Sequence, residues 1–213
     1  MQIDLKDVIP SYFEKNSITN SEVWGKTLSF IEGSHVNIVA PSGSGKTSLI
    51  HFIYGMRKDY TGIVSYDNIS INDFGLDKFS SFRQTYISIV FQDMRLFADL
   101  YVRQNIEIKR QLAPFHPAEK IDEMANRLGI GNKLERITNT CSYGEKQRVA
   151  IIRSLMQPFK FLLLDEPFSN LDDLNRAKAM ELIAEECATR NASMIFADLK
   201  KVDFFEGQRI LRL

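Results

Sequence analysis

A glycine-rich stretch with one lysine and one threonine carries the clearest chemical signal in the chain. Residues 41–48 follow an apolar run over 35–39, which predicts a buried strand, and precede helical spacing over 49–54. Two glycines let such a loop turn its backbone N–H groups inward, where they and the helix N-terminus attract phosphate. A lysine ammonium adds a full charge for the terminal phosphates, and a threonine hydroxyl can ligate Mg²⁺. We therefore expect phosphate binding by Pro41, Ser42, Gly43, Ser44, Gly45, Lys46, Thr47 and Ser48.

The residue at the start of this loop departs from the usual pattern. In G-x-x-x-x-G-K-[ST], the motif of such loops, Ala40 stands in place of the first glycine. A methyl group fits there if the residue keeps a negative φ, so we expect an intact loop. The alternative is an ordinary Gly/Ser turn before a helix, and Lys46 and Thr47 directly after the second glycine argue against it.

Polar side chains follow two further predicted strands. Asp165 and Glu166 end the apolar run 161–164, and Gln92 follows the run 87–91. Ligands of an open parallel sheet bind at the carboxyl ends of its strands. Beside a phosphate loop, the first carboxylate can hold Mg²⁺ and the second can polarise an attacking water. Acidic residues also end strands for solubility alone, and a lone glutamine is weak evidence, but the phosphate loop favours the catalytic interpretation.

The remaining elements form a pattern of strands, then helices, then strands. Residues 1–34 predict a few antiparallel strands ending near 28–31, and 62–71 predicts two short strands around an Asp–Asn turn. Three helical patterns follow, at 102–112, 117–128 and 145–156. A last helix and two strands are expected at 172–190, 193–197 and 207–213. This order predicts an α/β core that carries an all-helical insertion.

Aromatic residues upstream of the loop are candidates for stacking on a base. Tyr12 and Phe13 precede the Ser/Asn-rich turn at 16–21, and Trp24 follows it. An aromatic side chain in a half-buried strand is more often part of the core, and we expect strand burial to account for Trp24. The choice between Tyr12 and Phe13 stays open.

Composition and charge restrict the partners and the compartment. The 213 residues contain 27 Lys plus Arg and 27 Asp plus Glu, so no overall field attracts nucleic acid, which we do not expect as a partner. The apolar runs are much shorter than the ~20 residues that span a bilayer. No secretory signal begins the chain, and Cys141 and Cys187 lack metal-ligand spacing. We expect a cytosolic protein.

Five short motifs follow one another in order along nearly the whole chain. After the loop come Gln92 in Val-Phe-Gln-Asp, Cys-Ser-Tyr-Gly-Glu-Lys-Gln-Arg-Val at 141–149, Leu-Asp-Glu-Pro at 164–167 and Ser-Asn-Leu-Asp at 169–172. Together they resemble the Q-loop, signature, Walker B and D-loop motifs of the ATP-binding subunits of ABC transporters. Further details of the sequence are most similar to the lipoprotein-release, macrolide-export and cell-division ATPases of that family.

The resemblance implies a fold and a set of site residues. The fold is α/β, with a P-loop NTPase core containing a mixed sheet, an N-terminal antiparallel β-subdomain and an inserted α-helical subdomain. One domain would span 1–213, with 1–92 and 158–213 as core and 93–157 as helical subdomain. The cofactors would be ATP and Mg²⁺. The implied roles are catalysis by Glu166, Gln92 and Lys46, metal binding by Thr47, Gln92 and Asp165, and nucleotide binding by the loop, Tyr12, Ser142 and Gly144.

The resemblance also implies partners. ATP would close a sandwich dimer, either a homodimer or a heterodimer with a related ATPase subunit, and hydrolysis would reopen it. Ser142 and Gly144 would then face the nucleotide of the other subunit. An integral membrane permease subunit would dock a coupling helix between Gln92 and Leu100. The chain would therefore be cytoplasmic and peripheral, at the inner face of the cell membrane.

Two departures from the family pattern bear on activity. Cys141 and Tyr143 replace the usual leucine and glycine of the signature, and the tyrosine side chain could crowd the partner's phosphate. Ala197 stands where the family has a histidine that contacts the γ-phosphate. Losing such a transition-state donor typically lowers the rate by ~10²–10³. We expect an ATPase with slow turnover, and the alternative is an ATP-gated regulatory or structural module whose hydrolysis is slow or absent.

Overall fold

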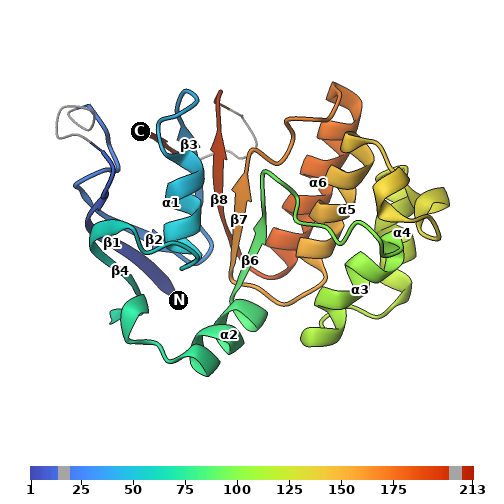
Figure 1. The fold of residues 1–213 in the computed structure, drawn as a ribbon, viewed down its shortest axis with the longest axis horizontal. Coiled ribbons are helices and arrows are strands. Elements are labelled where there is room, and N and C mark those ends of the chain that lie inside the picture. The colour runs from blue at the N-terminus through green and yellow to red at the C-terminus, as the bar shows by residue number, and fades with distance from the viewer. Residues whose placement is uncertain (14–19, 202–207) are drawn as a thin grey trace.

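The computed structural model describes residues 1–13, 20–201 and 208–213, which form two β-sheets and the helices that pack against them (Figure 1). The first sheet is antiparallel, in the order β2-β1-β4-β5. Its strands are β1 (Gln2–Pro10), β2 (Thr27–Ile31), β4 (Tyr60–Tyr66) and β5 (Ile69–Ser70). The second sheet is parallel, in the order β6-β7-β8-β3-β9. It contains β3 (His35–Val39), β6 (Ile87–Val90), β7 (Phe161–Asp165), β8 (Ser193–Asp198) and β9 (Arg209–Arg212).

Turn residues with positive φ shape the antiparallel sheet. Asp67 (φ 47°) and Asn68 (φ 66°) connect β4 to β5, as the Asp–Asn pair predicted. Gly62 (φ 85°) lies where the β1–β4 register shifts, and a Cβ there would come within 2.4 Å of the Lys6 and Asp7 carbonyl oxygens. Only glycine allows this close approach of the two strands.

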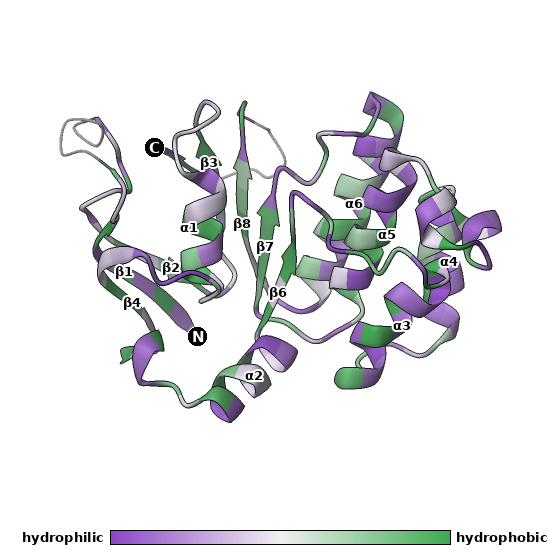
Figure 2. Ribbon diagram, in the orientation of Figure 1, coloured by the Kyte–Doolittle hydropathy of each residue, from purple (hydrophilic) through white to green (hydrophobic). Residues whose placement is uncertain are grey.

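The parallel sheet is buried on both faces, which explains its continuous apolar strands. All residues of β7 are buried, and the strands β6, β7 and β8 are largely hydrophobic in Figure 2. Because side chains alternate along a strand, Leu162 and Leu164 belong to one apolar cluster, whereas Phe161 and Leu163 belong to the other. The sheet therefore separates two cores, one shared with the helices between residues 102 and 189 and one shared with the helix after β3 and the antiparallel sheet.

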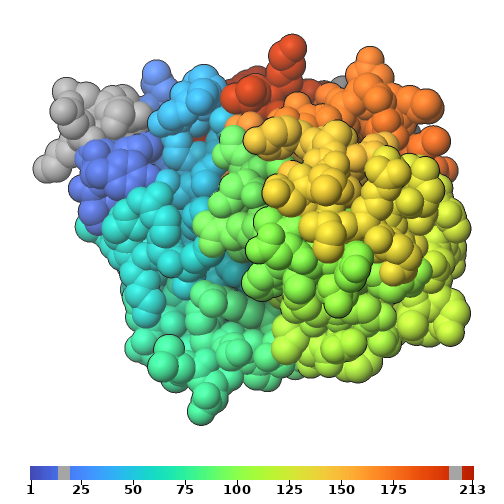
Figure 3. Space-filling model, turned by 45° about the vertical axis from the view of Figure 1, so that its right-hand side comes forward, coloured from blue at the N-terminus to red at the C-terminus, as the bar shows by residue number. Residues whose placement is uncertain are grey.

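The helices of the described residues divide between these two cores. Helix α1 (Lys46–Ile53) packs on β7 and β8 on the side of the antiparallel sheet. Helices α3 (Val102–Leu112), α4 (Glu119–Arg127), α5 (Tyr143–Leu155) and α6 (Asp173–Thr189) form the other side, and α2 (Leu76–Thr85) precedes β6. Figure 3 shows the green and yellow helical segment as one continuous part of the surface. Within the part of the chain that the structure describes, no helix is long and apolar enough to cross a membrane.

The predicted fold class is confirmed, and the differences are local. The helix predicted at 102–112 is α3, with the same bounds. Helix α5 begins at Tyr143, earlier than predicted, because Ser142 and Glu145 form a capping box. Helix α2 was not predicted, and its lack of buried residues explains why its apolar pattern is weak. Part of the predicted turn at 16–21 and the first residue of the predicted strand 207–213 lie outside the described residues.

Candidate functional site

The glycine-rich loop connects β3 to α1 at the carboxyl edge of the parallel sheet, the upper edge in Figure 1. Gly43 (φ 79°) and Gly45 (φ 94°) both adopt positive φ, as a loop that wraps around an anion requires. Ala40 is buried and is not among the residues with positive φ, so its methyl group is accommodated as expected. The loop geometry is therefore compatible with phosphate binding despite the missing first glycine.

Trp24 packs against this loop and hydrogen-bonds to it. It lies in a turn between β1 and β2, so the expected position in a strand was wrong, although the expected burial is confirmed at 2% exposure. Its Nε1 donates to the Ser44 carbonyl oxygen at 3.3 Å. A Cβ at Gly45 would lie 2.9 Å from the Trp24 ring and 3.1 Å from that of Phe13. The two aromatic rings thus pack directly against the second glycine.

Lys46 is a buried cation at the centre of the site. Its side chain is 4% exposed, and Nζ donates to the Ala40 and Pro41 carbonyl oxygens at 2.9 and 3.0 Å. The same Nζ lies 3.3 Å from Glu166 Oε1. The ammonium is therefore partnered by two carbonyl oxygens and one carboxylate.

A polar chain links three strand ends above the loop. Thr47 Oγ1 donates to Gln92 Oε1 at 3.2 Å, and Gln92 Nε2 donates to Glu166 Oε2 at 3.4 Å. Lys46 Nζ contacts the other oxygen of this carboxylate, Glu166 Oε1. These four side chains line a pocket of about 220 Å³ together with Tyr12, Ser42, Gly43, Gly45 and Ser48. The structure thus brings the sequence-predicted loop, glutamine and glutamate together.

Asp165 has no partner for either carboxylate oxygen among the described residues, although it is completely buried. Burial raises its pKa to about 6, against the opposing effect of the nearby Thr47 hydroxyl, and the neighbouring Glu166 charge also raises it. Asp165 lines a second pocket of about 380 Å³ with Thr47, Gln92, His51 and Asp93. A buried, unpartnered carboxylate beside a hydroxyl and an amide oxygen matches the oxygen ligands that Mg²⁺ prefers.

Tyr12 is the most accessible of the aromatic candidates, with 51% of its surface exposed. Its hydroxyl hydrogen-bonds to Ser48 Oγ, and Arg57 lies over its ring at 5.3 Å. Arg57 Nη1 also donates to Ser48 Oγ at 3.0 Å. A pocket of about 450 Å³ opens beside the loop and is lined by Tyr12, Phe13, Trp24, Pro41, Gly43, Ser44 and Leu213. Arg57 also pairs with Asp59, two residues further along the chain. The sequence offered no signal for its contact with Tyr12, because those two residues are distant in the chain.

The predicted signature residues lie at the start of α5, away from this pocket. Ser142 caps the helix, accepting from the Glu145 N–H at 3.3 Å, while Glu145 Oε2 accepts from the Ser142 N–H at 2.8 Å. Tyr143 is 70% exposed. A Cβ at Gly144 would lie 2.9 Å from the Asn170 carbonyl oxygen, so α5 packs closely on that segment. Ser142 and Gly144 do not line the pocket around Lys46.

Ala197 and Gln147 complete the surroundings of Glu166. Ala197 is fully buried, and its carbonyl oxygen accepts from the Glu166 N–H at 2.9 Å. Gln147 is fully buried on α5, and its Nε2 donates to the Glu166 carbonyl oxygen at 3.2 Å. The sequence analysis did not single out Gln147, because a polar residue in a helix predicts exposure.

Comparison with known sequences supports the motif assignment. A family model described as "ABC transporter" matches residues 25–169. The thiamine import ATP-binding protein ThiQ of Haemophilus influenzae is 36% identical over 171 residues, covering 79% of this chain and 77% of that protein. The macrolide export ATP-binding/permease protein MacB of Nitrosomonas europaea is 34% identical over 164 residues, covering 76% of this chain and 25% of that protein. The similar proteins therefore include both import and export proteins.

Solved structures agree with these sequence matches. The dimeric post-hydrolysis state of the ATP-binding cassette MJ0796, bound to ADP and phosphate, has a TM-score of 0.79 and 25% identity. That match covers 93% of this chain and 88% of the cassette. A second dimeric structure of MJ0796, described as a bacterial ABC transporter cassette, has a TM-score of 0.78 and 27% identity. That match covers 99% of this chain and 94% of the cassette.

Proposed function

The chain belongs to the ABC transporter family of ATP-binding proteins, and from that membership we propose how its residues bind and hydrolyse ATP. It is an ATP-binding and ATP-hydrolysing subunit of a transporter complex, and nucleotide-driven dimer closure powers a separate membrane subunit. The observation that carries the site assignment is the convergence of Lys46, Gln92 and Glu166 beside the unpartnered, buried Asp165. The reaction is attack of water on the γ-phosphate of ATP.

The loop residues bind the phosphates. The backbone N–H groups between Gly43 and Thr47 surround the anion, and Lys46 provides the positive charge. Phosphate oxygens then replace the Ala40 and Pro41 carbonyl oxygens as partners of the ammonium. The same movement separates Lys46 from Glu166, which leaves the carboxylate free to accept a proton from water.

Thr47, Gln92 and Asp165 would hold Mg²⁺. The ion would neutralise the charge that the β- and γ-phosphates share, which favours departure of ADP. The Thr47 hydroxyl donates to the side-chain amide oxygen of Gln92. Asp165 lines one pocket together with both residues. Gln92 also contacts Glu166, so one side chain touches both the metal ligands and the catalytic carboxylate.

The base of ATP stacks on Tyr12. Phe13 and Trp24 are engaged in packing against Gly45, whereas half of the Tyr12 surface is free. Arg57 reinforces this position, since it lies over the Tyr12 ring and binds Ser48. Tyr12 therefore presents an aromatic face at the entrance to the phosphate pocket.

Ser142 and Gly144 serve the nucleotide of a second subunit. They lie on the capped start of α5 and outside the pocket of their own chain, and both MJ0796 structures are dimers. The second subunit is another copy of this chain or a related ATPase subunit. Tyr143 projects from the same turn and reduces the space available for the partner's phosphate.

The membrane subunit docks between Gln92 and Leu100, with the chain bound at the inner face of the cell membrane. Phe97 in this segment is 55% exposed, which gives a coupling helix an apolar contact. Gln92 at the start of the segment touches Thr47 and Glu166, so docking and nucleotide binding act on one side chain.

A second candidate function follows from Ala197. Its methyl group supplies no donor to the γ-phosphate, and it lies directly beside the Glu166 backbone. A chain with this site would bind ATP and dimerise while hydrolysing it slowly or not at all, acting as a nucleotide-gated module.

Equilibrium binding of ATP tests the site assignment. We would measure the Kd for ATP by calorimetry, with and without Mg²⁺, in a Glu166→Gln background that prevents hydrolysis. Lys46→Ala should weaken binding by about two orders of magnitude or more, as loss of a charge-assisted contact predicts. Asp165→Asn should abolish the gain that Mg²⁺ gives while leaving metal-free binding intact. Unchanged affinity in Lys46→Ala would refute the assignment.

A further inference from the structure

Gln147 uses both ends of its side-chain amide on one short segment. Nε2 donates to the Glu166 carbonyl oxygen at 3.2 Å, and Oε1 accepts from the Asn170 N–H at 2.9 Å. The residue is fully buried, so neither contact competes with water. One side chain on α5 therefore fixes both ends of the turn that follows β7.

The backbone of Glu166 is in a conformation that needs such support. Its φ of 44° lies in the left-handed region, which is uncommon for a residue with a side chain. The Glu166 N–H donates to the Ala197 carbonyl oxygen at 2.9 Å, and the Glu166 carbonyl oxygen accepts from Gln147 Nε2 at 3.2 Å and from the Ser169 N–H at 3.3 Å. Both main-chain polar groups of Glu166 thus have a fixed partner.

This backbone conformation determines where the Glu166 carboxylate lies. With the main chain held, Oε1 comes within 3.3 Å of Lys46 Nζ and Oε2 within 3.4 Å of Gln92 Nε2. Gly144, three residues before Gln147 on the same face of α5, packs closely against the Asn170 carbonyl oxygen. Helix α5 therefore holds the turn at two successive contacts.

We propose that Gln147 is a positioning residue for ATP hydrolysis, which holds the Glu166 backbone so that the carboxylate faces the phosphate pocket. The proposal rests on the role proposed above for Glu166. Gln147 touches neither the loop nor the pocket around Lys46, so its effect falls on the catalytic step and not on nucleotide affinity.

Gln157 offers a matched control for substitution. It is 1% exposed, and its Nε2 also donates to main-chain carbonyl oxygens, those of Arg83 at 2.9 Å and Ile87 at 3.2 Å. Those contacts lie at the amino end of β6, away from Glu166. Replacing either glutamine by methionine, which has a similar shape, removes buried amide hydrogen bonds in the same way.

The test measures single-turnover ATP hydrolysis with enzyme in excess, the Kd for ATP, and amide hydrogen exchange over residues 165–171. We expect Gln147→Met to lower the hydrolysis rate by about 10- to 100-fold, the effect of a misplaced catalytic group, with Kd within about twofold. Exchange over 165–171 should accelerate in Gln147→Met alone, and this measurement requires no turnover. Gln157→Met should match the wild type in rate, Kd and exchange over 165–171, whatever stability it loses.

Two results would overturn the proposal, and they are distinguishable. Equal rates and equal exchange in Gln147→Met and Gln157→Met, with Glu166→Gln inactive, would show that Gln147 has no positioning role. A Glu166→Gln variant as active as the wild type would refute the proposed role of Glu166, and the inference with it.

Discussion

At the scale of single residues, the site contains a buried carboxylate whose charge is destabilising in the absence of a cation. The Asp165 carboxylate is buried without a hydrogen-bond partner among the described residues, and its pKa is raised by burial to about 6. A bound cation would offset this penalty. The residue is therefore expected to destabilise the metal-free fold and to be retained for ligand binding.

Substituting Asp165 tests this penalty through its pH dependence. An acid whose pKa is raised on folding destabilises the native state above the folded pKa and has no effect below the unfolded pKa. At pH 7, Asp165→Asn should stabilise the metal-free chain by up to about 3 kcal/mol, and the gain should shrink from pH 6 towards pH 4. Urea unfolding at pH 7 and pH 4.5 measures the difference in free energy of unfolding between the variant and the wild type. The control, exposed Asp93→Asn, should change stability by less than about 0.5 kcal/mol, and an equal gain there would contradict the account.

Ala197 gives a second residue-scale prediction. Restoring a donor with Ala197→His should raise the hydrolysis rate by about 10²-fold, because an imidazole supplies the missing hydrogen-bond donor at the position next to the Glu166 backbone. Ala197→Leu adds bulk without a donor and should not raise the rate. Phosphate release under saturating Mg²⁺-ATP separates the two variants. A histidine variant no faster than the leucine variant would show that the missing donor does not limit turnover.

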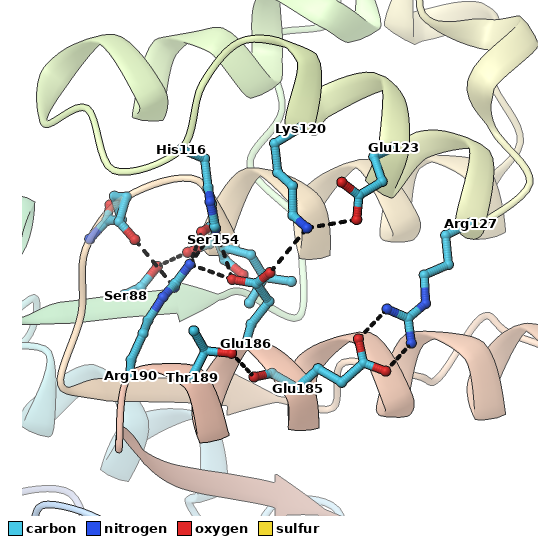
Figure 4. Close-up of polar contacts among 12 residues, drawn as sticks. Ser88, His116, Lys120, Glu123, Arg127, Ser154, Glu185, Glu186, Thr189 and Arg190 are labelled. Carbon is cyan, nitrogen blue, oxygen red and sulfur yellow. Dashed lines mark hydrogen bonds and ion pairs between the residues drawn. The ribbon is translucent and has the colours of Figure 1, made fainter.

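At the scale of elements, a polar cluster joins α4 and the segment before it to α6 (Figure 4). Glu186 accepts from Arg190 at 2.5 Å and lies 2.8 Å from His116 Nε2. Burial alone would raise the pKa of Glu186, but its hydrogen bond with His116 and the charge of Arg190 lower it overall. The Arg190 guanidinium also donates to the Leu155 carbonyl oxygen and lies against Phe115 and Phe159.

The two arginines of this cluster should differ greatly in their contribution to stability. Arg190→Ala leaves the buried Glu186 without its main cation, and we expect a loss of about 3–5 kcal/mol. Arg127, which pairs with Glu181 and Glu185 nearer the surface, should contribute at most about 1 kcal/mol. Chemical denaturation compares the two alanine variants. Similar losses would mean that burial of the ion pair does not govern its contribution.

At the scale of the whole molecule, the parallel sheet separates two cores and gathers the site at one edge. Strand β6 pairs with β7, and β8 lies between β7 and β3, so the residues after these strands meet at one edge although they are distant in sequence. The residues proposed to face a second subunit lie beside the other core, at the start of α5. Under that proposal, nucleotide binding by two chains would join surfaces that belong to different halves of each subunit.

The signature tyrosine gives a prediction for the dimer. Tyr143 is 70% exposed, so removing its ring should affect the isolated chain little while relieving the crowding across the interface. In a Glu166→Gln background with Mg²⁺-ATP, we expect Tyr143→Gly and Tyr143→Ala to increase the dimer fraction measured by light scattering. A decreased fraction in both variants would show that the tyrosine ring binds the partner.

The sequence predicted the fold and most of the site because those signals are local. Glycines with a following lysine, and an apolar run ending in carboxylates, are visible in short windows, and the predicted elements around them are confirmed. Helix α2 was missed because it buries no residue, and Trp24 was assigned to a strand because its contacts with the loop come from a turn. The contacts of Arg57 with Tyr12 and of Gln147 with Glu166 were missed because they join residues that are distant in sequence.

The most direct test of the central claim is ATP turnover by the purified chain, measured against Glu166→Gln as the blank. We expect the wild-type chain to release phosphate slowly, because Ala197 supplies no donor. We expect the Glu166→Gln variant to release none. Release no faster than that of Glu166→Gln, with enzyme in excess and with the membrane subunit reconstituted, would contradict hydrolysis at this site and favour the nucleotide-gated module.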